Sequence, residues 1–286
     1  MAIRIGTSTP SKLYFGSTEV TKIYLGASEV YSSGPNLDSD AQAYITAVET
    51  ADGQALEQGV KTAINDFVVG CKADGIWASI KASTILAGAR TLTGALTPLA
   101  GTAPTNFNFV SGDYHRKTGL LGNGSTKYLD SNRNNNADPQ DDRHLSIYKS
   151  VAPSSNTSSY MAAQITSPVG SSSRISDNSN TAIFSINSGS PASSSYNSQQ
   201  LGFLGVSRAN SSNIAYRANT TTTTAVNSSN FHIGINTLVF ARSVNGSANQ
   251  FTNARLSFYS IGESLDLALL DTRVSNLITA IGVAIP

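Results

Sequence analysis

The sequence predicts a mainly β protein with a helical segment, in which the C-terminal part forms an antiparallel β-sandwich. Three observations support this prediction. Short strand-like stretches between polar turns recur after residue 106, and helical periodicity is confined to residues 36 to about 90 and to the C-terminal end. Much of the polarity comes from Ser, Thr and Asn, as in residues 154 to 159 and 220 to 224. Such residues favour strands and turns over helices.

The N-terminal region contains a two-copy repeat. Residues 12 to 20 read Lys-Leu-Tyr-Phe-Gly-Ser-Thr-Glu-Val, and residues 22 to 30 read Lys-Ile-Tyr-Leu-Gly-Ala-Ser-Glu-Val. Each copy has the composition of a short strand followed by a glycine-containing turn, so residues 1 to 35 are expected to form a small β-ribbon, with Ile3 and Ile5 as a third strand. Such a ribbon is marginally stable alone, which favours an attachment module that pairs with other copies or a larger body. Folding back onto its own domain is the alternative.

Residues 36 to 105 are expected to form a helical neck. Asp38 or Ser39 is suited to cap a first helix, and Asp74-Gly75 is suited to end a second one. Apolar side chains at three- and four-residue spacing define a buried stripe on each helix. The stripe residues are Ala41, Tyr44, Ile45 and Val48 on the first helix and Leu56, Val60, Ile64, Phe67, Val68 and Cys71 on the second. Ile76, Trp77 and Ile80 predict a third, short helix.

Residues 106 to 286 are expected to form the sandwich. The strand candidates lie at residues 106 to 110, 128 to 130, 144 to 149, 182 to 187, 202 to 208, 213 to 217 and 238 to 244. Many short strands separated by polar turns are typical of a sandwich or barrel. No helical crossover lies between these candidates, which favours antiparallel pairing.

The C-terminal segment changes its period from two to about 3.6. Residues 254 to 262 predict a strand with Leu256, Phe258 and Ser260 on one face. Ser264 is then expected to cap a helix that has Asp266 in its first turn. One apolar stripe follows that helix: Leu267, Leu270, Val274, Leu277, Ile278 and Ile281. The stripe is expected to cover the sandwich or a neighbouring subunit.

Two stretches resemble a known family. Residues 255 to 271, Arg-Leu-Ser-Phe-Tyr-Ser-Ile-Gly-Glu-Ser-Leu-Asp-Leu-Ala-Leu-Leu-Asp, and 118 to 130, Thr-Gly-Leu-Leu-Gly-Asn-Gly-Ser-Thr-Lys-Tyr-Leu-Asp, resemble the last and first strands of concanavalin A-like (laminin-G-like) jelly-roll modules of bacteriophage virion proteins. Residues 22 to 31 resemble a motif that opens many phage tail and fibre proteins. The resemblance implies a virion structural protein with a jelly-roll domain, and it suggests a homotrimer. It implies architecture more firmly than activity.

Composition excludes several classes of function. Only 13% of the residues are charged and the net charge is +1, so no basic field for nucleic acid is expected. No stretch approaches the roughly 18 uninterrupted apolar residues of a membrane span, so we expect no membrane insertion. We expect no signal peptide, and the single cysteine, Cys71, is expected to be a small core residue.

The residues that bear chemistry do not form an enzymatic motif. The histidines are His115, His144 and His232; no Gly-x-Ser-x-Gly elbow is present, and Glu263 is the only glutamate after residue 106. We therefore expect no catalytic residue and no cofactor. The loop of residues 130 to 144 is rich in Asp and Asn, which are calcium ligands, but it lacks the EF-hand pattern. A solvated turn is the default interpretation, so no metal site is predicted.

A sugar site is the remaining ligand hypothesis. Carbohydrate sites combine aromatic faces with a few convergent polar groups. Tyr196, Arg208, Tyr216 and Arg217 fit this description, although surface Tyr and Arg also suit protein interfaces.

These inferences lead to one functional hypothesis with two alternatives. We expect a non-enzymatic bacteriophage virion protein, located in the virion after assembly in the host cytoplasm. In this hypothesis the chain is a tail or head fibre that binds other virion proteins through the N-terminal ribbon and presents the sandwich to a host-surface glycan. The first alternative is a capsid decoration (cement) protein, and the second is a polysaccharide depolymerase.

Overall fold

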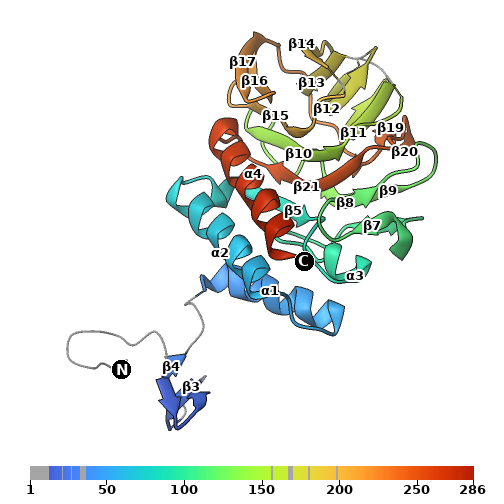
Figure 1. The fold of residues 1–286 in the computed structure, drawn as a ribbon. Helices are drawn as coiled ribbons and strands as arrows, with labels where there is room; N and C mark the ends of the chain where they lie inside the picture. Colours follow the sequence, from blue (N-terminus) through green and yellow to red (C-terminus); the bar gives the residue numbers. More distant parts are fainter. Residues whose placement is uncertain are drawn as a thin grey trace. The chain divides into compact units, whose positions relative to one another are not determined.

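The computed structural model describes residues 13–20, 22–26, 28–32, 37–155, 157–166, 170–179, 181–197 and 199–286. The chain divides into two compact units, Met1–Ser39 and Asp40–Pro286. Two antiparallel sheets form a sandwich in the second unit, and a helix ends the chain (Figure 1). The predicted mainly β fold with an antiparallel sandwich is therefore confirmed.

The N-terminal unit contains two separate hairpins. Strand β1 (Leu13–Phe15) pairs with β2 (Thr18–Val20), and β3 (Lys22–Leu25) pairs with β4 (Ser28–Ser32). Each copy of the repeat therefore folds back on itself, whereas we predicted one strand per copy. Gly16 (φ 66°) and Gly26 (φ 62°) make the tight turns, since glycine adopts positive φ without steric cost. Ile3 and Ile5 lie outside the described residues.

Two of the three helices predicted before residue 90 are present. Helices α1 (Ser39–Asp52) and α2 (Gln58–Ala73) bury the stripes that the sequence predicted, and Gly75 (φ 72°) follows the end of α2. The third prediction was wrong, because only the 3₁₀ turn η1 (Trp77–Ser79) forms there. The chain then enters strand β5 (Ile80–Ile85), which pairs with the last strand of the protein, β21 (Arg255–Gly262). The apolar spacing of Ile76, Trp77 and Ile80 predicted a helix, but pairing with β21 makes the chain extended from Ile80 onward.

An eight-stranded sheet forms one layer of the sandwich. Its order is β17-β16-β15-β10-β21-β8-β7, and β5 also pairs with β21. Apart from β5 and β21, its strands are β7 (Tyr114–His115), β8 (Gly119–Leu121), β10 (Arg143–Val151), β15 (Gly202–Arg208), β16 (Asn213–Ala218) and β17 (Thr221–Val226). Strand β21 lies in the middle of this sheet, so the C-terminal strand does belong to the body of the sandwich, as expected.

A nine-stranded sheet forms the other layer. Its order is β14-β13-β12-β11-β18-β9-β6, and β19 and β20 continue from β11. The strands are β6 (Thr105–Phe107), β9 (Tyr128–Asn134), β11 (Thr157–Ile165), β12 (Ser171–Asn178), β13 (Thr181–Ser188), β14 (Ala192–Asn197), β18 (Asn236–Val239), β19 (Arg242–Val244) and β20 (Ser247–Asn249). The pairing is antiparallel except between β11 and β19, which run parallel.

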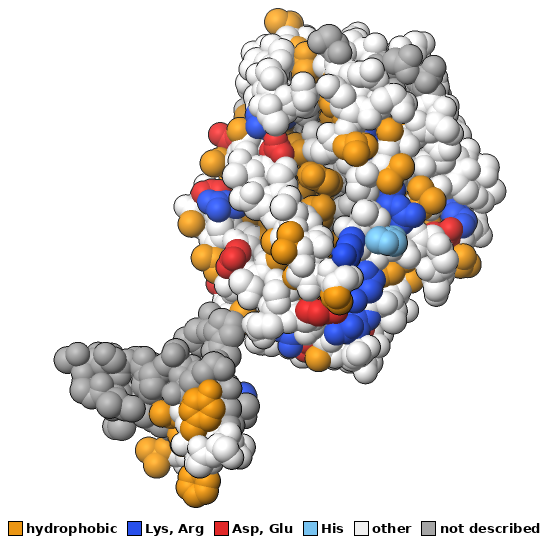
Figure 2. All heavy atoms as spheres, in the orientation of Figure 1, with side chains coloured by type: hydrophobic (Ala, Val, Ile, Leu, Met, Phe, Trp, Pro, Cys, Tyr) orange, Lys and Arg blue, Asp and Glu red, His pale blue; other side chains and the backbone are white. Residues whose placement is uncertain are grey.

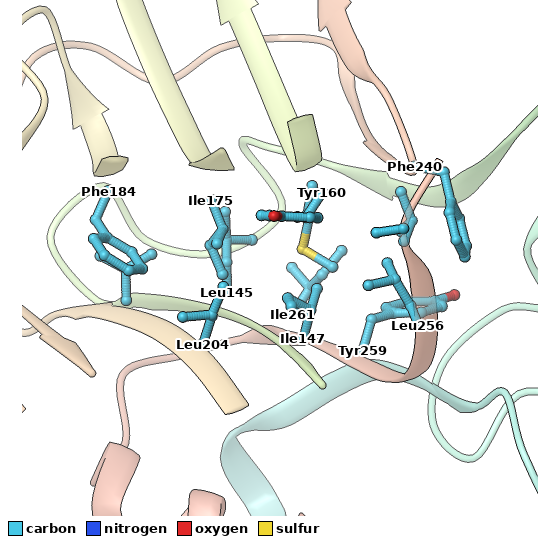
Figure 3. Close-up of a cluster of buried hydrophobic side chains, with 14 of the residues drawn as sticks. Leu145, Ile147, Tyr160, Ile175, Phe184, Leu204, Phe240, Leu256, Tyr259 and Ile261 are labelled. Carbon is cyan, nitrogen blue, oxygen red and sulfur yellow. The ribbon is translucent and has the colours of Figure 1, made fainter. Parts of the chain in front are cut away.

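The core lies between the two sheets. Figure 3 shows Leu145, Ile147, Leu204 and Ile261 on one side facing Tyr160, Ile175 and Phe184 on the other. Strand β21 does not alternate as predicted. Tyr148 pairs with Phe258 and Lys149 with Leu256, so Ser257 is an extra residue that forms a bulge. As a result Leu256, Tyr259 and Ile261 all belong to the sandwich core.

Helices cover the outer face of the eight-stranded sheet. Helix α2 packs along α4 (Leu267–Ala284), and the Phe67 ring of α2 meets the Phe258 ring of β21 edge-on at 5.7 Å (Figure 1). Residues 40 to 105 therefore belong to the same compact unit as the sandwich, and the expected boundary at residue 105 falls inside this unit. The neck segment supplies helices and a strand to the sandwich body.

Helix α4 buries the six stripe residues that the sequence predicted. The sequence predicted Ser264 as the N-cap, and this prediction was wrong. The N-cap is Asp266, whose carboxylate accepts hydrogen bonds from the backbone N–H groups of Ala268 (2.7 Å) and Leu269 (3.2 Å). By length and mean hydropathy (1.3), α4 is the one helix of the described chain that is apolar enough to cross a membrane. In this structure, however, its apolar side packs against α2 and the eight-stranded sheet.

Candidate functional site

A polar hollow lies where the ends of the two sheets meet. Strand β14 of one sheet and strands β16 and β17 of the other form its walls. Its volume is about 260 Å³. The lining residues are Ser194, Tyr196, Gln200, Tyr216, Ala218, Asn219, Thr221 and Thr223. Two of the four residues predicted to bind a ligand, Tyr196 and Tyr216, therefore lie in one depression.

The two tyrosines are held in place by contacts behind the hollow. The Tyr216 ring stacks on Phe184, with ring centroids 4.9 Å apart and planes 5° from parallel. The Tyr196 hydroxyl donates a hydrogen bond to the carbonyl oxygen of Gln200. Both side chains are largely buried, at 5% exposure for Tyr196 and 9% for Tyr216. A ligand in the hollow would therefore meet the edges of these rings, as part of a rigid wall, more than open faces on which to stack.

The two predicted arginines do not line the hollow. Arg208 is fully buried, and its guanidinium donates to the carbonyl oxygens of Ile186 (2.9 Å) and Asn210 (3.0 Å) and to Asn227 Oδ1 (2.6 Å). Burial lowers the pKa of Arg208. These bonds tie β15 to β13 and to the chain after β17, so Arg208 has a structural role in this conformation.

Arg217 faces away from the hollow. Neighbouring residues of a strand point to opposite faces, so Arg217 projects from the side of β16 opposite to Tyr216. Its Nε lies 2.7 Å from Asp271 Oδ2 of α4, and its Nη1 donates to Thr222 Oγ1 at 2.9 Å. This ion pair fixes α4 to the sheet. The structure thus brings together the two tyrosines and separates both arginines from them.

A buried charged network lies behind Tyr196. Lys149 Nζ of β10 is 5.1 Å from the centroid of the Tyr196 ring and donates to the Tyr160 hydroxyl at 3.1 Å. The Tyr160 hydroxyl in turn donates to Asp177 Oδ2. These groups connect β10 of one sheet with β11 and β12 of the other, through the middle of the sandwich.

Burial favours the uncharged forms of Lys149 and Asp177. Burial lowers the pKa of Lys149 to about 8, against the opposing effect of the Asp177 charge. It also raises the pKa of Asp177, although the Tyr160 hydrogen bond and the Lys149 charge act in the opposite direction. Lys149 was not predicted to be an interior residue. The signal was present, because Lys149 follows Leu145 and Ile147 at a spacing of two.

A histidine and two serines make a second buried cluster. His144 Nε2 lies 2.8 Å from Ser260 Oγ, which lies 2.7 Å from Ser146 Oγ, and His144 Nδ1 lies 2.6 Å from the carbonyl oxygen of Glu263. The distances are those of a nucleophile and base, but the three side chains are fully buried, and the group behind His144 is a carbonyl and not a carboxylate. Burial lowers the pKa of His144 to about 4. The cluster joins β10 to β21.

In the loop of residues 130 to 144, three of the aspartates contact protein donors. Asp138 forms an ion pair with Arg133, Asp130 Oδ1 accepts from the Asn132 amide at 2.8 Å, and Asp142 Oδ1 accepts from the Ser264 amide at 2.7 Å. Within the part of the chain that the structure describes, no group of three or more His, Cys, Asp or Glu is placed to hold a metal ion. These aspartates therefore stabilise the conformation of the loop.

Comparisons with known proteins give only distant similarity. No family model matches the sequence, and no curated protein matches it. Among solved structures, the binding domain of botulinum neurotoxin serotype D is similar, with a TM-score of 0.42 and 12% identity over 69% of this chain and 51% of that domain. A point mutant of HCR/D gives a TM-score of 0.42 and 11% identity over 69% and 52%.

The chain spans about half the length of these two structures. A TM-score of 0.42 carries no inference about the fold or the function of this chain.

Proposed function

We propose that the chain is a structural protein of a bacteriophage virion, a tail or head fibre that presents its sandwich to the host surface. The observation that carries the proposal is the division into two units of different character. A small unit of two repeated hairpins precedes a compact sandwich. This is the organisation expected of a chain that attaches at one end and displays a domain at the other.

The N-terminal unit has the surface of an attachment module. Tyr14, Phe15, Tyr24 and Leu25 are 58%, 86%, 55% and 67% exposed. Figure 2 shows hydrophobic side chains at the surface of the described part of this unit. Exposed apolar residues at matching positions of two repeats support docking to other virion proteins or to further copies of the chain. A homotrimer, which the family resemblance suggests, is part of the proposal.

The hollow at the end of the sandwich supports contact with a host glycan. It offers the amide of Asn219 and the hydroxyls of Thr221 and Thr223 beside two fixed tyrosines. A few polar groups beside aromatic walls are typical of small-ligand sites. The resemblance to jelly-roll virion modules supports the same function.

The proposal is tested first by the position of the protein in the particle. Electron microscopy of virions labelled with an antibody against the full chain is expected to place the label on a fibre. A label distributed as a lattice over the capsid would contradict the fibre and support a decoration protein. Light scattering of the purified chain is expected to give the mass of three copies.

The glycan role is tested at the hollow. Thr223→Trp fills the hollow from strand β17 and is expected to weaken binding of the full chain to host cells or to a glycan array at least 10-fold. Thr224→Trp, on the opposite face of the same strand, is the matched control. Equal binding by both variants would contradict this role, and release of reducing sugar from host polysaccharide would indicate a depolymerase.

A further inference from the structure

The outer face of the nine-stranded sheet carries a pair of arginines in one row. Arg174 of β12 and Arg242 of β19 both pair with Ala162 of β11, one on each side. Directly paired residues project from the same face of a sheet. Met161 and Ile175, one position away, lie in the sandwich core, so the row Arg174–Ala162–Arg242 points outward.

Among the described residues, no acidic side chain forms an ion pair with either of the two arginines. Arg174 and Arg242 form no ion pair within the described residues, and Arg174 Nε is buried with no hydrogen-bond partner. Arg242 donates to two neutral oxygens, Asn249 Oδ1 (3.1 Å) and Gln164 Oε1 (2.9 Å). Burial lowers the pKa of both arginines, and the charge of Arg242 lowers that of Arg174 further. Two half-buried positive charges thus repel each other without a counter-charge.

The geometry of the sheet suits an anion shared by both arginines. Neighbouring strands lie about 4.8 Å apart, so the backbones of Arg174 and Arg242 are roughly 10 Å apart with only the methyl group of Ala162 between them. Two arginine side chains are long enough to reach one group across such a span. Small hydroxyls continue this face: Ser172 and Ser185 lie beside Arg174, and their Oγ atoms are 2.8 Å apart.

We propose that this row is a binding site for the carboxylate of an acidic sugar, such as a uronic acid. The planar guanidinium donates two parallel hydrogen bonds to a carboxylate. The side-chain amides of Gln164 and Asn249 flank Arg242, and their NH₂ groups suit the hydroxyls of a sugar ring. This site is separate from the hollow at β14, and it stands whether or not the chain is a fibre.

Titration calorimetry of the full chain tests the site. Oligogalacturonate is expected to bind, and a neutral oligosaccharide of equal length is expected not to bind measurably. Arg174→Gln and Arg242→Gln, which keep polar side chains without charge, are each expected to weaken binding about 10-fold or more. Lys117→Gln, which removes one positive charge between β7 and β8 of the other sheet, is the control and should leave the affinity unchanged.

Three results would overturn the proposal. The first is unchanged affinity in both arginine variants, with thermal unfolding showing that they are folded. The second is equal binding of the neutral oligosaccharide. The third is inorganic phosphate that binds as tightly as oligogalacturonate, because that would show a general anion site and not a site for acidic sugars. Arg174→Lys separates charge from shape: it retains the charge, but it is expected to bind more weakly than the wild type because it lacks the guanidinium fork.

Discussion

The two outer faces of the sandwich differ in what covers them. On the eight-stranded sheet, α2 and α4 pack on apolar residues such as Phe258, so both faces of β21 are buried. On the nine-stranded sheet, the outward positions of β11 and β12 include serines, Ala162, Gln164 and Arg174. The chain thus uses its helices to complete a core on one side. The other side has the polar surface of a face that meets solvent or a ligand.

The largest expected effect is on the covered face. Phe258→Ala removes a fully buried ring from the contact with Phe67 and leaves a cavity beneath α2. We expect the free energy of unfolding to fall by about 3–5 kcal/mol, measured by urea denaturation. A loss below about 1 kcal/mol would mean that the helices contribute little to this side of the sandwich.

The next effect concerns the interior between the two faces. The pKa of Lys149 is about 8 in the folded protein, below its usual value, so the folded state releases a proton that the unfolded state still holds between about pH 8 and pH 10. The penalty for burying the ammonium group is therefore complete below pH 8 and decreases as the pH rises.

The wild type is accordingly expected to gain stability between pH 7 and pH 9 relative to Lys149→Met, by roughly 1 kcal/mol. Urea denaturation of both proteins at the two pH values measures this difference. Parallel pH dependence of the two proteins would show that Lys149 does not titrate in this range.

A smaller effect is expected at the start of the covering helix. Asp266→Ala removes the N-cap of α4 and should reduce the free energy of unfolding by about 1 kcal/mol. Ser264→Ala is the matched control, and it should change stability by less than about 0.5 kcal/mol because the structure places Ser264 before the cap. A larger effect of Ser264→Ala would support the cap that the sequence pattern predicted.

The smallest effect is expected on the uncovered face. Arg174→Gln removes one of two repelling charges and breaks no hydrogen bond or ion pair that the described structure contains. We expect stability to change by less than about 0.5 kcal/mol, or to rise slightly, in thermal unfolding. A loss comparable to that of Phe258→Ala would show that this face is part of the structural core.

The helices were predictable because their stripes stand out from polar surroundings. Val60, Ile64 and Phe67 recur at helical spacing, and no distant contact is needed to recognise them. Strands β11 and β12 were missed for the opposite reason. Ser173 and Ser158 are buried on the inward face, and Ser172 and Ser176 are buried on the outward face, so polarity does not alternate with orientation.

The candidate sites depended on contacts that the sequence does not display. Arg217 reads as a surface residue until α4 brings Asp271 to 2.7 Å from it, 54 positions later in the chain. Arg174 and Arg242 become neighbours only through their shared partner Ala162. Tyr196 and Tyr216 were named only as part of a set of four with Arg208 and Arg217, and their common position at one depression comes from the pairing of the strands in the structure.

Each N-terminal repeat forms its own hairpin, and this determines how the region responds to deletion or duplication of a repeat. Because the turns at Gly16 and Gly26 complete two independent ribbons, neither hairpin uses a strand of the other. Deleting or duplicating one ten-residue copy therefore alters how many exposed aromatic tips the chain carries and leaves the pairing within each remaining copy intact. The number of exposed aromatic side chains can in this way vary while the sandwich stays unchanged.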